Sequence, residues 1–266
     1  MELTLLGTGN ALVTECYNTC FVITDGTKRF LVDGGGGNGV LVQLKRAGID
    51  WHDIHEIFVT HKHIDHIVGI VWLIRLICQN MAKGAYEGVV TIYGHDEVLT
   101  IVRSIADMLL QPKQTRFIDD RVHLVTVEDG ETRTIIGHEV TFFDIQSTKA
   151  KQFGFTMDMG DGRKLTCCGD EPYNECERAY AEGSTWLLHE AFCLHGQADI
   201  FSPYEKHHST VKDACELAEE LSAENLVLYH TEDRNIARRK ELYAVEGSAY
   251  YRGNLYIPDD LETIVL

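Results

Sequence analysis

The chain has 266 residues, of which 44% are hydrophobic, so it can bury a substantial core and is not an intrinsically disordered protein. Its formal net charge is −17, from 41 acidic and 24 basic residues. This balance argues against a protein whose affinity comes from gripping phosphate backbones, because such proteins concentrate Lys and Arg.

The cysteines and the apolar segments indicate in which cellular compartment the protein is expected. Eight cysteines occur without a C-x-x-C pair, which argues against a zinc ribbon or a thioredoxin-like site. No basic start followed by an apolar run marks a secretory signal. The longest apolar stretch, Ile64 to Ile77, is interrupted by Asp65, His66 and Arg75, so it predicts no membrane span. We expect a cytoplasmic protein with reduced thiols and, without a linker of low complexity, a single domain over residues 1–266.

The first half predicts short strands followed by an alternation of strands and helices. Apolar or β-branched runs between turn residues predict strands at Leu3–Leu6, Cys20–Thr24, Arg29–Val32, Ile54–Thr60 and Val89–Tyr93. Apolar periodicity predicts helices at Val40–Ala47, ending at Gly48, at Ile64–Asn80, and at Asp96–Leu110 with Asp96 as N-cap.

The second half repeats this order. Strands are predicted at Val122–Val127, Thr132–Ile136, Glu139–Ile145, Gln152–Met159, Lys164–Cys168, Thr185–His189 and Leu226–Tyr229, with edge strands at Leu255–Ile257 and Thr263–Leu266. Helices are predicted at Tyr173–Ala181 and Val211–Leu221. Strands then helices, twice over, predict an α/β fold: a four-layer αβ/βα sandwich of two mixed β-sheets packed face to face with helices outside. The repeated order leaves an internal duplication open.

The strongest chemical signal is Thr60-His61-Lys62-His63-Ile64-Asp65-His66, directly after a predicted strand. Imidazole is the usual zinc ligand, and a nearby carboxylate can bind the ion or orient the imidazole. His61 and His63 point the same way in an extended turn, whereas Asp65 and His66 begin the next helix, so the loop can serve two metal ions. The alternative is a His-rich surface loop that binds nothing.

This motif is the signature of the metallo-β-lactamase superfamily, and the chain resembles its ribonuclease Z branch from about Leu3 to Arg234. The segments that carry the resemblance are Leu6-Gly7-Thr8-Gly9 followed by Asn18-Thr19, Val32-Asp33-Gly34-Gly35, Cys168-Gly169-Asp170, His189-Glu190-Ala191-Phe192, His208-Ser209-Thr210 and Tyr229-His230-Thr231. They are specific as a set and weak singly.

The resemblance implies roles for residues far from the motif. Asp170 would bridge both metal ions, His230 would be the last ligand, and Asp33 would orient a ligand histidine. His208, held by Glu190, would be the general acid. Each also has a structural alternative on its own: turn or helix-cap chemistry for Asp33 and Asp170, a hydrogen-bonded histidine at a buried strand end for His230, and a solvated loop for His208. They gain weight together because each follows a predicted strand, where ligand sites of α/β folds gather.

Two departures from the branch matter. Gln146 stands where a ligand histidine is usual, and a neutral amide oxygen is a poorer zinc ligand than imidazole. The resemblance then implies one ion bound by His61, His63 and Asp170, with Gln146 weak or vacant. The branch's long arm that grips transfer RNA has no room between Ser147 and Gly169.

The second ion would be bound by Asp65, His66, His230 and the shared Asp170, so we expect one well-made site and one depleted site. The cofactor is one or two divalent ions, with zinc first and Mn or Fe as alternatives. The depleted site allows three outcomes: a mono-metal protein, a weaker second ion, or lost activity.

The function expected is that of a metal-dependent hydrolase, specifically a phosphodiesterase acting on a small or nucleotide phosphodiester through a metal-activated water, with Asp65 orienting or deprotonating it. The alternatives are a ribonuclease Z-like RNA endonuclease, a hydrolase of thioesters, lactones or sulfate esters, and a catalytically impaired protein that binds metal and ligand. The acidic charge and the missing arm make transfer RNA a less expected partner. Members of the branch are often dimers, so the resemblance allows a homodimer.

Overall fold

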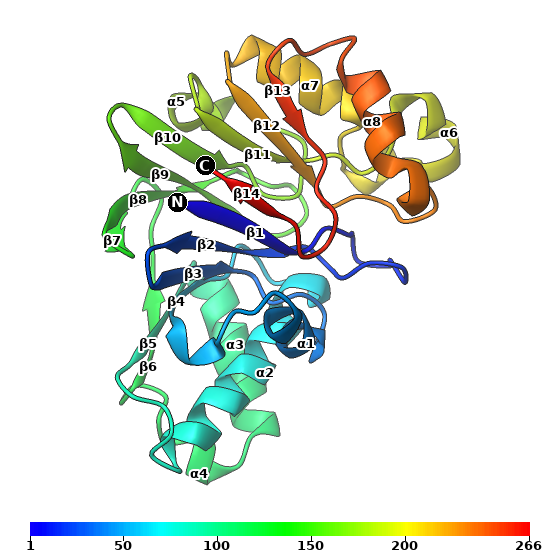
Figure 1. Cartoon of the computed structure of the whole chain (residues 1–266). Helices are drawn as coiled ribbons and strands as arrows, with labels where there is room; N and C mark the ends of the chain where they lie inside the picture. The colour runs from blue at the N-terminus through cyan, green and yellow to red at the C-terminus, as the bar shows by residue number, and fades with distance from the viewer. The chain divides into compact units, whose positions relative to one another are not determined.

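A computed structural model describes all 266 residues, which divide into two compact units. Unit 1 comprises Met1–Gly7, Tyr17–Glu128 and Asp260–Leu266, and unit 2 comprises Thr8–Cys16 and Asp129–Asp259. Each unit contains one seven-stranded mixed β-sheet with its own helices (Figure 1). The expectation of a single domain stays a prediction.

Unit 1 has the strand order β14-β1-β2-β3-β4-β5-β6. The first four strands of this order pair antiparallel and the strands from β3 to β6 pair parallel, so β3, β4 and β5 all end at the same edge. The strands are β1 (Glu2–Gly7), β2 (Cys20–Asp25), β3 (Lys28–Val32), β4 (Ile54–Phe58), β5 (Val90–Gly94), β6 (Val122–Thr126) and β14 (Thr263–Val265).

Helices α1 (Gly39–Arg46), α2 (Ile64–Met81) and α3 (Asp96–Leu109) cover one side of this sheet, and α4 (Pro112–Thr115) follows (Figure 1). Helix α2 is long and apolar enough to cross a membrane, yet 61% of it is buried inside the chain. Its apolar side chains form the core of unit 1 together with those of the sheet, among them Ile67, Ile70, Leu73, Ile74 and Ile77. This burial is the pattern of a core helix.

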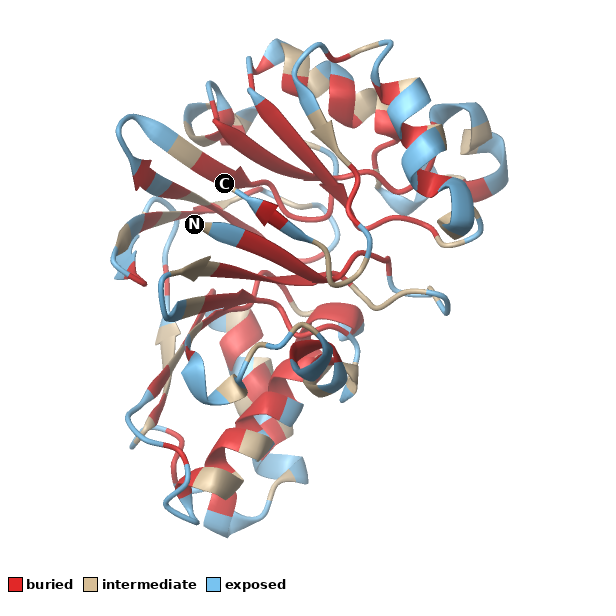
Figure 2. Cartoon of the chain, viewed as in Figure 1, coloured by how far each residue is buried: buried red, intermediate tan, exposed pale blue.

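Unit 2 has the strand order β13-β12-β11-β10-β9-β8-β7 and the same change from antiparallel to parallel pairing, here at β10. The strands are β7 (Thr132–Ile135), β8 (His138–Asp144), β9 (Phe153–Gly160), β10 (Arg163–Cys167), β11 (Trp186–Glu190), β12 (Asn225–Tyr229) and β13 (Asn254–Tyr256). The helices are α5 (Arg178–Ala181), α6 (Ala198–Phe201), α7 (Val211–Glu220) and α8 (Arg239–Gly247). Figure 2 shows the middle strands of both sheets mostly buried and the helices buried on one face only.

The structure differs from the sequence prediction at several helices, and the short helices α4 and α6 were not predicted. The helix predicted at Tyr173–Ala181 is a short 3-10 turn at Glu175–Glu177 followed by α5. Asp96 is the first residue of α3 rather than its N-cap, because the ring nitrogen of His95 accepts from Val98 N instead. Helix α8 was not predicted. The turn at Gly48 after α1 is as predicted, and Thr210 caps α7.

A buried acid lies beside α5. Glu177 is fully buried, and its Oε1 accepts a 2.8 Å hydrogen bond from Asn174 N. Burial raises the pKa of this carboxyl from 4.5 to about 8, against the opposing effect of the Asn174 hydrogen bond. The folded protein therefore keeps Glu177 protonated at neutral pH, whereas the unfolded chain ionises it.

We expect Glu177→Gln to remove a loss of stability that the wild type suffers between about pH 4.5 and 8. The unfolded wild type releases a proton that the folded form retains over this range, so its free energy of unfolding falls as the pH rises. The variant should exceed the wild type by about 2–4 kcal/mol at pH 8.5 and match it near pH 4.5. Urea unfolding across pH checks this. An equal pH slope in Glu177→Gln and in the exposed control Glu205→Gln contradicts it.

Candidate functional site

The histidine motif of unit 1 occupies the connection from β4 to α2. Strand β4 ends at Phe58, His63 is the N-cap of α2, and Asp65 and His66 lie in the first turn of the helix. His61, Asp65 and His66 are buried, and His63 is half-buried. The parallel pairing of β3, β4 and β5 places this loop at the carboxyl edge of the sheet, where binding sites of such sheets occur.

Asp33, the first residue after β3, connects this loop to the sheet. Its Oδ1 accepts from Thr60 N at 2.9 Å, and its Oδ2 accepts from Thr60 Oγ1 at 2.8 Å. Oδ2 also lies 2.7 Å from Nδ1 of His66. A carboxylate accepts only, so Nδ1 of His66 carries the proton and the lone pair is on Nε2. This is the arrangement in which a carboxylate sets the tautomer of a metal-binding histidine.

His61 and His63 bring two ring nitrogens together. Thr60 Oγ1 lies 2.9 Å from Nδ1 of His61 and donates its own proton to Asp33, so it accepts from His61. The lone pair of His61 is then on Nε2, which lies 2.8 Å from Nδ1 of His63. Two imidazole nitrogens bound to one tetrahedral zinc ion are about 3.3 Å apart, so the pair suits a common ion.

The start of α2 packs against the glycine run after β3. Gly34 N donates to His66 O and Gly69 N donates to Gly35 O, each at 2.9 Å. A Cβ on Gly69 would lie 1.8 Å from Gly34 O, so only glycine permits this approach. The backbone of the glycine run thereby fixes the helix turn that carries Asp65 and His66.

In unit 2, Asp170 and His230 lie side by side at the carboxyl ends of parallel strands. Asp170 follows β10, His230 follows β12, and both side chains are buried. Nε2 of His230 lies 3.2 Å from Oδ2 of Asp170. His230 has a φ of +56°, a left-handed conformation that a non-glycine residue adopts only where the surroundings enforce it.

Arg239 supports the backbone beside His230. This guanidinium is fully buried, and it donates to Thr231 Oγ1 at 2.7 Å and to Thr8 Oγ1 at 3.1 Å. It also donates to Pro258 O at 2.8 Å. Thr231 N donates to Thr8 O at 2.9 Å. These bonds account for the enforced conformation after β12.

Asp170 receives an amide hydrogen bond from Gln152, not from Gln146. Nε2 of Gln152 donates to Oδ1 of Asp170 at 2.6 Å, and both residues are buried. Gln146 is exposed after β8, with a φ of +56°, and its backbone N donates to Asp144 Oδ1 at 2.8 Å. The ligand role of Gln146 stays a prediction.

His208 and Glu190 form the third part of unit 2. Nδ1 of His208 lies 3.6 Å from Oε2 of Glu190, whose other oxygen accepts from Ser209 N. The His208 ring stacks on Phe192, with centroids 4.9 Å apart, and its centroid lies 5.1 Å from that of His230. Burial lowers the pKa of His208, but Glu190 and Asp170 outweigh it, so the pKa lies above its ordinary value.

The donors in both units suit a divalent ion such as Zn²⁺. Unit 1 offers three imidazoles and the carboxylate of Asp65, and in unit 2 the ligand atoms of Glu190, His208 and His230 lie within 4.8 Å of one another. Imidazole nitrogen and carboxylate oxygen are the donors of catalytic zinc sites, and all of these side chains except His63 and His208 are buried.

Some supporting residues were not predicted from the sequence. Thr60, Gln152 and Phe192 each contact a candidate residue, and Arg239 bonds to Thr231 beside His230. Thr60 and Phe192 had a signal, because each is part of a motif quoted from the sequence. Gln152 and Arg239 belong to no such motif.

The sequence model of a family described as anti-Pycsar protein Apyc1 matches residues 1–245. The chain belongs to the Apyc1 family of anti-Pycsar proteins. Among curated relatives, ribonuclease Z of Synechococcus sp. strain CC9902 is 26% identical over 312 aligned positions, covering 98% of this chain and 91% of the relative.

Solved structures show the same fold. The metallo-β-lactamase fold protein YhfI of Bacillus subtilis superposes with a TM-score of 0.81 at 17% identity, covering 99% of this chain and 98% of that one. Human tRNase Z, short form, has a TM-score of 0.75 at 21% identity, covering 100% of this chain and 99% of that one. Zn²⁺-bound PqqB of Methylobacterium extorquens has a TM-score of 0.75 at 14% identity, covering 100% of both chains.

The predicted metallo-β-lactamase fold is therefore confirmed. As the motifs indicated, the chain is similar to the ribonuclease Z-like branch of this superfamily.

Asp33→Asn tests the support of His66. Asparagine tolerates the φ of +58° at this position, but its amide cannot accept all three hydrogen bonds of the carboxylate. Supporting partners of this kind contribute about 10–100-fold to metal affinity. We expect zinc affinity, measured by competition with a chromogenic chelator, to fall by that factor. The matched control is Asp161→Asn, an exposed turn residue with a φ of +54°. Equal affinity in both variants contradicts the role.

Proposed function

We propose that this protein is a metal-dependent phosphodiesterase of the cytoplasm that hydrolyses a small or nucleotide-type phosphodiester. The observation that carries the proposal is the His208–Glu190 pair beside His230. A phosphodiester has an alkoxide leaving group that must be protonated, and a carboxylate-held imidazole next to a metal ligand is suited to that task.

The proposed ligands are His61, His63, Asp65 and His66 of unit 1, with Asp170 and His230 of unit 2, as the resemblance implies. Gln146 is a weak ligand at most in this proposal. They would bind one or two divalent ions, with zinc first; the structural relative PqqB is Zn²⁺-bound. When bound, such ions lower the pKa of a water and stabilise negative charge on phosphoryl oxygens.

The roles of the protein's own groups follow from their contacts. Asp65, a buried carboxylate whose Oδ2 lies 3.5 Å from Nε2 of His66, orients the attacking water and accepts its proton. His208 donates a proton to the leaving oxygen, and Glu190 and Phe192 keep its ring in place. Asp33 and Gln152 orient the ligands His66 and Asp170.

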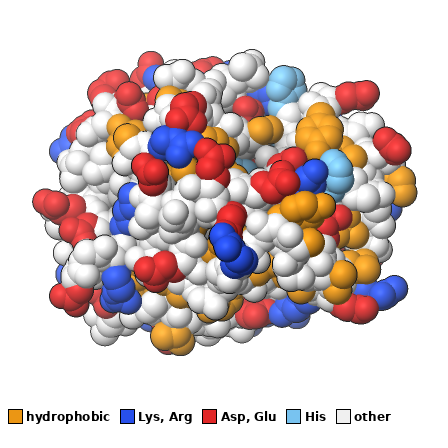
Figure 3. Space-filling model, turned by 90° about the horizontal axis from the view of Figure 1, so that it is seen from above, with side chains coloured by type: hydrophobic (Ala, Val, Ile, Leu, Met, Phe, Trp, Pro, Cys, Tyr) orange, Lys and Arg blue, Asp and Glu red, His pale blue; other side chains and the backbone are white.

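An RNA substrate is the alternative that the relatives favour, because the curated ones are ribonucleases Z. Three observations weigh against transfer RNA. Strands β9 and β10 fill the connection where the branch has its arm, and the Synechococcus alignment needs 312 positions against 266 residues here. The net charge is −17. On the face in Figure 3, Lys and Arg side chains lie apart among acidic and uncharged ones.

Replacing Asp65 by Ala should lower turnover of bis(4-nitrophenyl) phosphate by about a thousandfold or more, since the variant loses a ligand and the group that orients water. Circular dichroism should show an unchanged fold. The control Asp120→Ala removes an exposed aspartate and should retain full activity. Unchanged turnover in Asp65→Ala refutes the role. A wild type that holds metal but hydrolyses no phosphodiester would support the non-catalytic alternative.

His208→Ala should discriminate between leaving groups. A nucleoside leaving group needs a proton from an acid, whereas 4-nitrophenolate leaves without one. We expect kcat to fall by about 10²–10⁴-fold on a nucleoside phosphodiester and far less on 4-nitrophenyl esters. An equal loss on both substrates rules out general-acid catalysis by this residue. Faster wild-type turnover of a thioester, lactone, sulfate ester or precursor transfer RNA would contradict the substrate class.

A further inference from the structure

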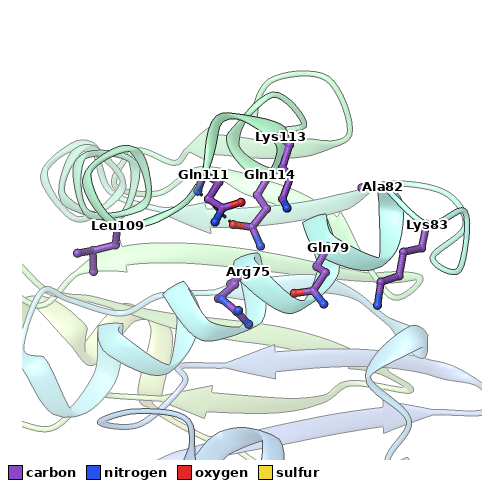
Figure 4. Close-up of a pocket in the computed structure, with 8 residues that line it drawn as sticks. All are labelled: Arg75, Gln79, Ala82, Lys83, Leu109, Gln111, Lys113 and Gln114. Atoms are coloured by element: carbon purple, nitrogen blue, oxygen red, sulfur yellow. Dashed lines mark hydrogen bonds between the residues drawn. The ribbon is translucent and has the colours of Figure 1, made fainter.

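A pocket of about 490 Å³ lies in unit 1 beside the carboxyl end of α2, near the end of α3 and α4 (Figure 4). Its polar lining consists of Arg75, Gln79, Lys83, Gln111, Lys113 and Gln114. The volume falls in the range of pockets that bind small molecules. None of these residues belongs to the candidate metal ligands.

Two of the lining residues share a face of α2. Arg75 and Gln79 are four residues apart on the helix, which puts their side chains above one another, and Lys83 lies in the turn after the helix ends at Met81. Lys113 and Gln114 approach from α4 on the opposite side of the pocket (Figure 4).

The charge of this lining is opposite to that of the chain. Arg75, Lys83 and Lys113 line the pocket and no carboxylate does, although the chain has 41 acidic and 24 basic residues. None of the three cations forms an ion pair with a carboxylate of the protein. Three such cations around one cavity produce a local positive potential that attracts an anion.

Gln114 adds a buried donor. Its Oε1 accepts a 3.1 Å hydrogen bond from Gln111 N, which fixes the orientation of the amide. The Nε2 group of this buried residue therefore remains as a donor. Guanidinium, ammonium and amide donors together match the oxygen atoms of a phosphate group.

An apolar groove of about 300 Å³ continues from the pocket and shares Arg75 and Leu109 with it. Trp72 in this groove has a side chain that is 38% exposed, and the guanidinium carbon of Arg75 lies 5.8 Å from the centroid of its ring. Indole rings and guanidinium planes are the surfaces on which nucleobases stack. The groove therefore suits a flat aromatic group linked to the anion.

We propose that this pocket is a second ligand site, which binds a nucleotide with its phosphate among Arg75, Lys83 and Lys113 and its base against Trp72. The site is separate from the ligands of α2. Asp65 and His66 lie in the first turn of the helix, and Arg75 lies about 15 Å further along the axis than Asp65.

The test is isothermal titration of the metal-loaded protein with AMP, adenosine and inorganic phosphate. The double variant Lys83→Gln/Lys113→Gln should bind AMP about tenfold more weakly than the wild type, because two charge-assisted contacts are lost. The matched control Lys28→Gln/Lys45→Gln removes the same charge from exposed lysines outside the pocket. Trp72→Leu should weaken AMP binding and leave phosphate binding unchanged. Any AMP binding at the metal site is the same in the wild type and in the three variants, so differences between them report on the pocket.

Equal AMP affinity in the pocket variant and the control variant overturns the proposal, as does the absence of AMP binding to the wild type beyond that at the metal site. The assignment to a nucleotide is overturned if AMP binds no more tightly than inorganic phosphate and Trp72→Leu leaves AMP binding unchanged. Tighter binding of dodecyl phosphate than of AMP overturns it too, since the groove would then take an alkyl chain.

Discussion

The buried carboxylate of Asp33 is the contact on which the ligand loop of unit 1 depends. It takes hydrogen bonds from the backbone and hydroxyl of Thr60 and from the ring of His66, so it joins the ends of β3 and β4 to the first turn of α2. Removing an acceptor of this kind leaves buried donors unsatisfied, which costs about 1–3 kcal/mol for each. One side chain therefore sets the path of the loop, the tautomer of a ligand and the start of the core helix.

Unit 2 reaches a comparable result through backbone conformation. His230 has a left-handed φ, as Asp33 does, and conformations of this kind cost on the order of 1–2 kcal/mol at a non-glycine residue. The bonds of Arg239 to Thr231 and Thr8 offset this cost beside His230, and the bond from Gln152 holds the carboxylate of Asp170. The candidate ligands are thus held in position by the fold itself, which is the condition for a preorganised site.

Local structure could be predicted from the sequence, whereas contacts between residues far apart in the sequence could not. Strand and helix periodicity predicted nearly all the long elements, and the spacing of His61, His63, Asp65 and His66 predicted the loop after β4. Gln152 was hidden because amides near a strand have many roles, and its partner Asp170 lies 18 residues away. Arg239 was hidden for a similar reason, since a buried cation is evident only once Thr8 and Pro258 surround it. The 3-10 turn at Glu175–Glu177 departs from periodicity because the capping of Asn174 by Glu177 tightens the chain there.

The pairing of β14 with β1 has a consequence for how the protein is made. Glu2, Leu3 and Thr4 lie opposite Val265, Ile264 and Thr263, so the sheet of unit 1 gains its outermost strand from residues that the ribosome adds some 260 positions later. Until then β1 has one bare edge, and such edges invite association with other chains. Nearly all residues of unit 2 lie in one continuous stretch, so unit 2 can fold before the last strand of unit 1 has been synthesised. Within unit 1, β1 is therefore the strand whose edge stays open to other chains until β14 has been added.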